Sequence, residues 1–192
     1  MSEPYCVLLR AQITRERVAE YLLSTTKPAA TYDDWTKCTG FIDVASVADR
    51  MDAWLVSLDA RTGATYGDAF EAYRRQAMEP SFFRFYYDDT HGVLHQASLL
   101  YAQGASELVA HLCVARGIGE FLRDDETGII AVHDPFIGNG TAGAISLAAG
   151  QSQVVDIDAQ VEAKVGAMVA ELPTLASLEN DKGRDELDTF LS

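Results

Sequence analysis

Residues 82–101 read FFRFYYDDTHGVLHQASLLY, and this stretch decides the fold. The aromatic run at 82–87 has the composition of a β-strand. A cluster of turn-forming residues follows at 88–92, and residues 93–101 have the composition of a returning strand. The stretch therefore predicts an antiparallel β-hairpin, so the fold is expected to contain an antiparallel sheet.

The segments around this hairpin alternate between strand-like and helix-like patterns. They are a strand at 6–13, a helix from Thr14 that stops before Pro28, a loop at 29–42, helices at 43–58, 68–78 and 106–123, and a strand at 128–133. This order is that of the split β-α-β arrangement. We therefore predict an α+β fold with a ferredoxin-like antiparallel sheet, helices on one face, a helical insertion and a C-terminal helix.

The chain after His133 has two interpretations. In the first, residues 138–140 form a tight turn and residues 142–148 return as a strand. In the second, the glycines form a ligand-binding loop and residues 142–149 form a helix. Both interpretations include a short strand at 153–157 and a helix from Ala159 that ends at Pro173.

Length and composition predict one folded unit that is strongly acidic. We expect a single α+β domain at 1–173 and an acidic tail at 174–192. The 192 residues have a net charge of −14, and residues 124–192 contain 13 acidic residues and 3 basic ones. Phosphates repel a chain of this charge, which argues against nucleic acid or an anionic membrane as the partner and favours a basic protein.

The sequence favours a cytoplasmic protein. The N-terminus lacks the basic and apolar regions of a signal peptide, and no apolar run approaches the length that crosses a bilayer. Cys6, Cys38 and Cys113 are odd in number and widely spaced, which suits reduced, mostly buried thiols.

No complete catalytic or metal-binding motif is present. His91 and His95 are separated by a turn, whereas His111 and Cys113 lie two positions apart on an expected helix and so point in different directions. We therefore assign no catalytic residue, no metal site and no cofactor to this chain.

One local stretch resembles the S-adenosylmethionine loop of DNA amino-methyltransferases, which reads D-P-F-x-G-[SN]-G-T. The matching residues are Asp134, Pro135, Phe136, Gly138, Asn139, Gly140 and Thr141. The resemblance implies, as an alternative function, a degenerate or truncated methyltransferase-like domain that binds the cofactor through Asp134, Gly138, Gly140 and Asp156. The chain has no Pro-Pro motif for the target amine, and too few residues follow Asp134 for a full doubly wound sheet.

Acidic residues stand beside aromatic ones in the expected loops. Such a combination suits a protein interface, because acids steer a basic partner and aromatic side chains anchor it. The candidate partner-binding residues are Asp33, Asp34, Trp35, Tyr86, Tyr87, Asp88, Asp89, Asp124, Asp125 and Glu126.

The arrangement of segments across residues 5–157 resembles the small acidic immunity proteins of bacterial toxin–immunity pairs. The segments that carry the resemblance are the strand and helix at 7–17, the hairpin at 85–94, the helix at 107–118 with its acidic turn, and the strand at 129–132. The resemblance implies a cytoplasmic, non-enzymatic inhibitor that binds a cognate, basic toxin and occludes its active site.

Overall fold

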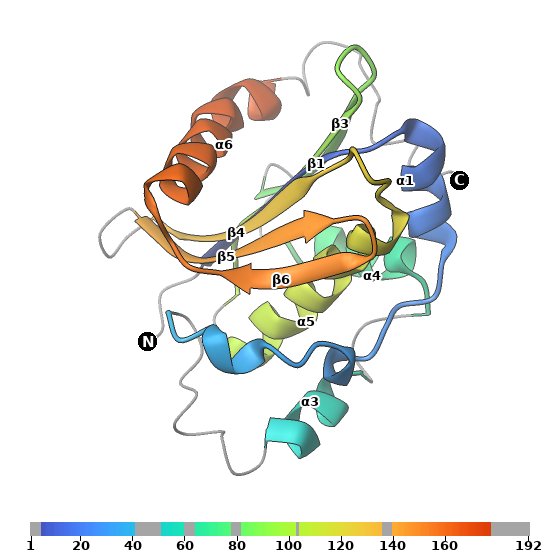
Figure 1. The fold of residues 1–192 in the computed structure, drawn as a ribbon, viewed down its shortest axis with the longest axis vertical. Helices are drawn as coiled ribbons and strands as arrows, with labels where there is room; N and C mark the ends of the chain where they lie inside the picture. The colour runs from blue at the N-terminus through green and yellow to red at the C-terminus, as the bar shows by residue number, and fades with distance from the viewer. Residues whose placement is uncertain are drawn as a thin grey trace.

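The computed structural model describes residues 5–40, 51–59, 64–77, 82–102, 104–135 and 140–177. These residues form an α+β fold around one antiparallel sheet, which confirms the predicted class (Figure 1). The strands are β1 (Tyr5–Gln12), β2 (Phe83–Asp88), β3 (Val93–Ala102), β4 (Gly128–Asp134), β5 (Gly140–Ala148) and β6 (Gln151–Val155). The helices are α1 (Arg15–Leu23), α3 (Met51–Asp59), α4 (Tyr66–Gln76), α5 (Ala105–Arg116) and α6 (Ala159–Ser177), with 3-10 turns η1 (Ala29–Thr31), η2 (Trp35–Lys37) and η5 (Gly117–Phe121).

The sheet has the strand order β2-β3-β1-β4-β5-β6. The hairpin predicted at 82–101 is present, because β2 pairs with β3 from Phe83 opposite Ser98 to Asp88 opposite Val93. β1 lies between β3 and β4 and is antiparallel to both. β5 and β6 then extend the sheet beyond β4, so it is larger than a four-stranded split β-α-β unit.

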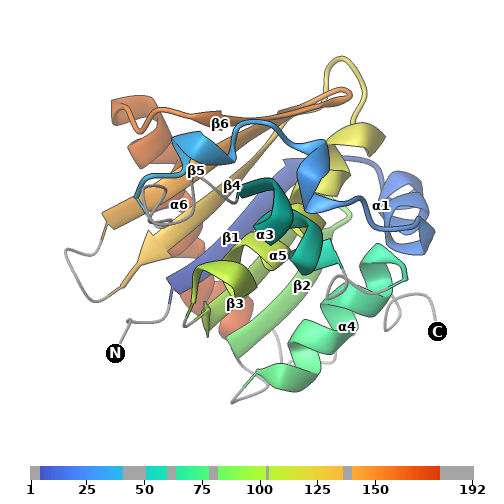
Figure 2. The same ribbon diagram turned by 90° about the horizontal axis from the view of Figure 1, so that it is seen from below.

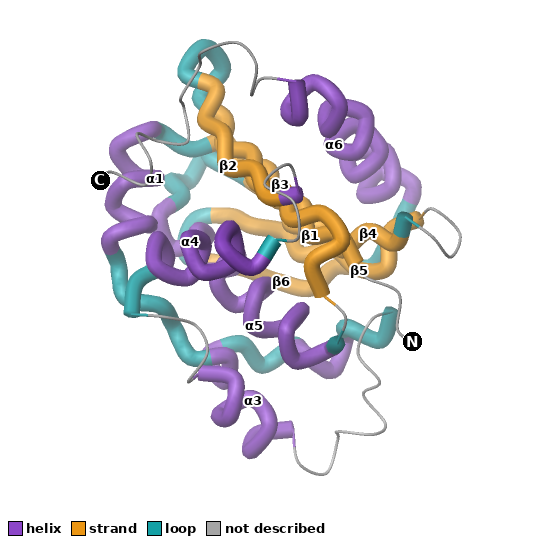
Figure 3. Tube along the Cα trace, turned by 180° about the vertical axis from the view of Figure 1, so that it is seen from behind, coloured by secondary structure: helices purple, strands orange, loops and turns teal. Residues whose placement is uncertain are grey.

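Helices cover both faces of the sheet, which corrects the expectation of helices on one face (Figures 1 and 3). The reason lies in β1, which is apolar on both sides. Val7 and Leu9 face the larger core beneath α1, α4 and α5. Leu8 between them packs in a second cluster with Val165 and Met168 of α6. A continuous apolar run is typical of a strand that is buried on both faces.

The predicted helical insertion is present between α1 and β2, where α3 and α4 lie on the α5 side of the sheet (Figure 2). α4 begins at Tyr66, slightly before the predicted position 68. Thr65 accepts a hydrogen bond from the backbone N–H of Asp68, and the Asp68 carboxylate accepts one from the Thr65 N–H. This capping box fixes the start of the helix. Residues 43–50 of the predicted helix at 43–58 lie outside the described residues.

The helix predicted at 106–123 is shorter than expected. α5 ends at Arg116, and the chain continues as the tighter turns of η5. A side chain at Gly117 would place its Cβ 2.3 Å from the phenol of Tyr66. The glycine therefore lets the end of α5 approach α4 closely.

The segment after β4 follows the first of the two interpretations. Gly140–Ala148 is a strand antiparallel to β4, so the alternative helix at 142–149 is wrong. α6 begins at Ala159 as predicted, but it continues through Pro173 to Ser177, which corrects the predicted end. Proline lacks the N–H donor and its ring crowds the carbonyl four residues earlier, so it usually ends a helix. Here the helical conformation continues for four more residues. Of the expected tail at 174–192, residues 178–192 lie outside the described residues.

Candidate functional site

Three loops meet at the end of the sheet where β1 finishes. The backbone N–H of Ile13 donates to the carbonyl of Gly92 at 3.0 Å, which joins the start of α1 to the β2–β3 turn. The N–H of Gln12 donates to the carbonyl of Thr127 at 2.8 Å, which joins β1 to the loop before β4. These contacts surround a surface depression of about 370 Å³. Residues that are distant in sequence therefore share one edge of the molecule.

Carboxylates gather on this edge. We call them the acidic loop edge, which consists of Glu16, Asp88, Asp89, Asp124 and Asp125. Glu16, Asp89, Asp124 and Asp125 are exposed, and Glu16, Asp89 and Asp125 line the depression. The sequence predicts four of these five acids, and the fold adds Glu16 from α1. The structure thus brings the predicted acids of the β2–β3 turn and of the 124–126 turn together.

The carboxylates of the β2–β3 turn differ in their contacts. Asp88 accepts hydrogen bonds from the backbone N–H groups of Thr90 and His91, and its other oxygen lies 2.6 Å from Nδ1 of His91. The His91 contact, together with these backbone bonds, lowers the pKa of Asp88. Asp89 instead points outward, with 65% of its side chain exposed, and pairs with Arg15 at 3.0 Å. Asp88 therefore shapes the turn, while Asp89 is available at the surface.

Two residues predicted to bind a partner at this edge are internal. Tyr87 is 4% exposed, and its hydroxyl donates to the carbonyl of Ile13 at 2.9 Å. Burial raises the pKa of Tyr87. Glu126 is also buried and accepts the backbone N–H of Arg123 at 2.8 Å. Tyr86 is half-buried beside the ring of His95. The expectation of exposed aromatic anchors is therefore wrong for Tyr87.

The residues predicted at 33–35 lie elsewhere and are mostly buried. Trp35 is 1% exposed, and its indole N–H donates to the carbonyl of Ala29. Asp34 is buried and pairs with the buried guanidinium of Arg116 at 2.7 Å. Its second oxygen accepts the N–H of Val154 in β6 at 2.6 Å. These contacts correct the expectation of a surface site, because they tie η2 to α5 and to the outer edge of β6. Among the three, only Asp33 is exposed.

Arg116 holds this buried cluster together. Its guanidinium carbon lies 4.0 Å from the ring centroid of Tyr32 and 4.7 Å from that of Trp35. Its nitrogens also donate to the hydroxyl and the carbonyl of Ser152 in β6, both at 2.8 Å. The cluster therefore supports the structure, and it covers part of a sheet edge that would otherwise present unpaired backbone groups.

The alternative cofactor loop does not have the expected surroundings. A strand–loop–helix unit would direct a helix N-terminus at the ligand. Here Asp134 pairs with Gly140 across the antiparallel ladder of β4 and β5, and Asp156 is exposed after β6. Gly138 lies outside the described residues. The expected loop followed by a helix is therefore wrong for the residues from Gly140 onwards, which form the strand β5.

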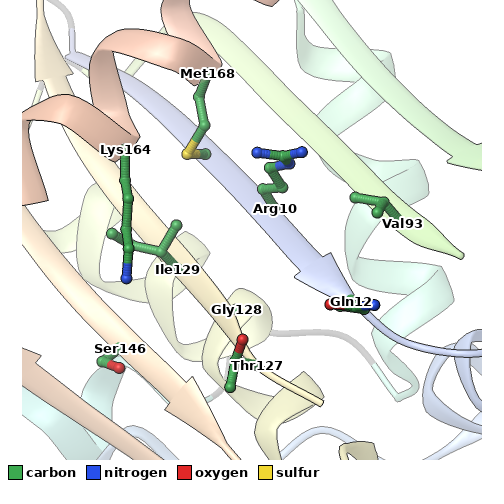
Figure 4. Close-up of a pocket in the computed structure, with 9 residues that line it drawn as sticks. All are labelled: Arg10, Gln12, Val93, Thr127, Gly128, Ile129, Ser146, Lys164 and Met168. Atoms are coloured by element: carbon green, nitrogen blue, oxygen red, sulfur yellow. The ribbon is translucent and has the colours of Figure 1, made fainter. Parts of the chain in front are cut away.

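A second depression, of about 360 Å³, lies between α6 and the sheet (Figure 4). Arg10 rises into it from β1 and Lys164 descends into it from α6. The sequence analysis missed this site, because strand and helix patterns do not reveal which helix covers which face. The only local signal is Arg10, a cation inside an otherwise apolar strand.

The described residues show no group of three His, Cys, Asp or Glu side chains placed to hold a metal ion. Cys6, Cys38 and Cys113 are buried thiols. None of the described helices combines the length and apolar character that a membrane crossing requires. Comparison of the chain with protein-family models, with curated proteins and with solved structures gives no significant match. Its function must therefore be inferred from its own residues.

Proposed function

We propose that this chain is a cytoplasmic, non-enzymatic immunity protein that binds a cognate, basic toxin and occludes its active site. The observation that carries this proposal is the acidic loop edge, where carboxylates from the first turn of α1, from the β2–β3 turn and from the turn before β4 occupy one end of the sheet. A surface of this kind suits a partner with a basic cleft.

The charges on this edge are only partly neutralised. Arg15 pairs with Asp89. Within the described part of the chain, Glu16, Asp124 and Asp125 have no ion pair. An excess of exposed negative charge raises the rate at which a positive partner is captured. In a toxin whose cleft binds phosphate groups, the same carboxylates would take the place of the substrate's charges.

The rigidity of the edge also supports an inhibitory role. Backbone hydrogen bonds join the three loops to β1, and Asp88 fixes the β2–β3 turn from within. A preorganised surface loses little conformational entropy on binding, so more of the contact energy appears as affinity.

The test is protection of growing cells. Each gene that neighbours this chain's gene is expressed in a bacterial host with and without the chain, and we expect one product to arrest growth when it is expressed alone. We expect the wild-type chain to restore growth, and the variant Asp89→Lys/Asp125→Lys to restore it poorly. Asp88 is left intact because it shapes the turn.

The matched control is Asp52→Lys/Asp156→Lys, which changes the net charge equally at two exposed acids outside the edge. We expect this control to protect like the wild type. Lack of protection by the wild-type chain, or equal protection by all three proteins, would contradict the proposal.

A further inference from the structure

We infer that the depression between α6 and the sheet binds a small organic anion, a carboxylate or a phosphate monoester attached to an apolar body. This site adjoins the depression at the acidic loop edge, because Gln12 lines both, but the inference does not depend on the proposed function. Asp89 and Asp125 do not line this depression.

Two cations from different elements enter the depression. Arg10 comes from β1 and Lys164 from α6, and Figure 4 shows both side chains in the space between the helix and the strands. Neither forms a hydrogen bond within the described residues. The nearest carboxylate to Arg10 is that of Glu171, at 4.0 Å, and the same carboxylate also faces His95 at 3.5 Å. The carboxylate of Glu171 is therefore shared between Arg10 and His95. Lys164 has no ion pair to a described residue.

The rest of the lining fits a ligand with two parts. Gln12, Thr127 and Ser146 bring an amide and two hydroxyls, which donate and accept hydrogen bonds. Ile129 from β4 and Met168 from α6 provide the apolar part of the lining. In small-molecule sites, apolar side chains usually contact the body of the ligand, while a few polar or charged groups orient it. Here the two cations would hold a charged head, and the apolar part of the lining would contact an apolar body. The volume of about 360 Å³ admits a ligand of this size.

Because of the net charge of the chain, binding of an anion at this site must depend on short-range contacts. The net charge of −14 repels anions at a distance, so long-range attraction does not bring the ligand in. Binding must come from direct hydrogen bonds of the guanidinium and ammonium groups, which are stronger than those between neutral groups.

The experiment titrates the isotope-labelled full chain with four probes and follows its backbone amide signals by NMR. Phenyl phosphate and benzoate carry an anionic head on an apolar body. Inorganic phosphate is the head alone, and benzamide is the body without the charge. We expect saturable shifts at Arg10, Gly128 and Lys164 with one or both of the first two probes. The tighter of the two identifies the head group. We expect weaker binding of inorganic phosphate and of benzamide.

Variants test the two cations. Arg10→Gln/Lys164→Gln should weaken the tighter probe by about tenfold or more, because each lost charge-assisted hydrogen bond contributes on that scale. The matched control is Lys37→Gln/Arg75→Gln, which removes two exposed cations outside the depression and should bind like the wild type. Asp89→Lys/Asp125→Lys should also retain binding, which separates this site from the proposed function.

Three outcomes would overturn the inference. They are the absence of saturable shifts with both organic anions, undiminished binding by Arg10→Gln/Lys164→Gln, and benzamide or inorganic phosphate that binds as tightly as the organic anions.

Discussion

Asp34 and Asp33 are adjacent acids with opposite surroundings. Asp34 is buried against Arg116, whereas Asp33 is exposed. Asp34→Ala leaves a buried guanidinium without its partner, so we expect it to lower the free energy of unfolding by about 3 kcal/mol or more. Asp33→Ala should change it by less than about 0.5 kcal/mol. Urea unfolding of both variants measures the difference, and equal effects would contradict the structural role of Asp34.

The burial of His111 should make the free energy of unfolding depend on pH. It is 0% exposed beneath Tyr73, whose ring stacks on it at 4.4 Å. Desolvation lowers the pKa of His111 to about 3. In the unfolded chain the group takes a proton near pH 6.5, while in the folded chain it stays neutral. The folded state therefore loses stability as the pH falls from about 6.5 toward 3, by up to about 1.4 kcal/mol per pH unit.

The prediction for His111 is read from the pH dependence of urea unfolding. His111→Gln has no titrating group at this position, so its unfolding free energy should fall less steeply with decreasing pH than that of the wild type. The acidic residues contribute equally to both proteins. Parallel curves would show that the imidazole is not held neutral.

At the scale of elements, the junction of α5 and η5 depends on one close contact. A Cβ at Gly117 would meet the phenol of Tyr66 at 2.3 Å, whereas one at Gly166 in α6 would meet nothing within 4 Å. We expect Gly117→Ala to destabilise the protein by about 1–3 kcal/mol through overpacking. Gly166→Ala should stabilise it by up to about 1 kcal/mol, because alanine favours the helix. Thermal unfolding compares the two, and a neutral Gly117→Ala would contradict this packing.

Elements with a clear local pattern could be predicted from the sequence. The aromatic run, the turn residues and the returning strand identify the β2–β3 hairpin, and the spacing of Val165 and Met168 identifies α6. The face that α6 covers could not be predicted, because an apolar stripe does not specify which surface it meets. The end of α5 was missed because Tyr66, which crowds Gly117, is distant in the sequence.

The candidate site was predicted only in part for the same reason. Asp89, Asp124 and Asp125 are in turns, and their local composition indicates the exposure that the structure shows. Glu126 belongs to the same acidic run as Asp124 and Asp125 but is buried. Asp34 and Trp35 have the same local character, but their exposure depends on Arg116, which lies far along the chain. The depression beside Arg10 depends on the docking of α6, and a single cation in β1 does not specify it.

At the scale of the whole molecule, the fold places its acids unevenly. The acidic loop edge lies at the end of β1, while cations line the depression beneath α6. Partner capture should therefore depend on where charge lies as well as on the net charge of −14. Salt separates the two effects, because it screens steering between exposed charges while leaving close contacts largely intact.

The most direct measurement of the proposed docking surface is the association rate constant of the purified chain with the toxin domain against which it is proposed to protect, at low and high salt. At low salt we expect Asp89→Lys/Asp125→Lys to associate about tenfold or more slowly than the wild type, and Asp52→Lys/Asp156→Lys to associate nearly as fast as the wild type. The differences should shrink at high salt. Equal association rates for both variants at low salt would contradict the acidic loop edge as the docking surface.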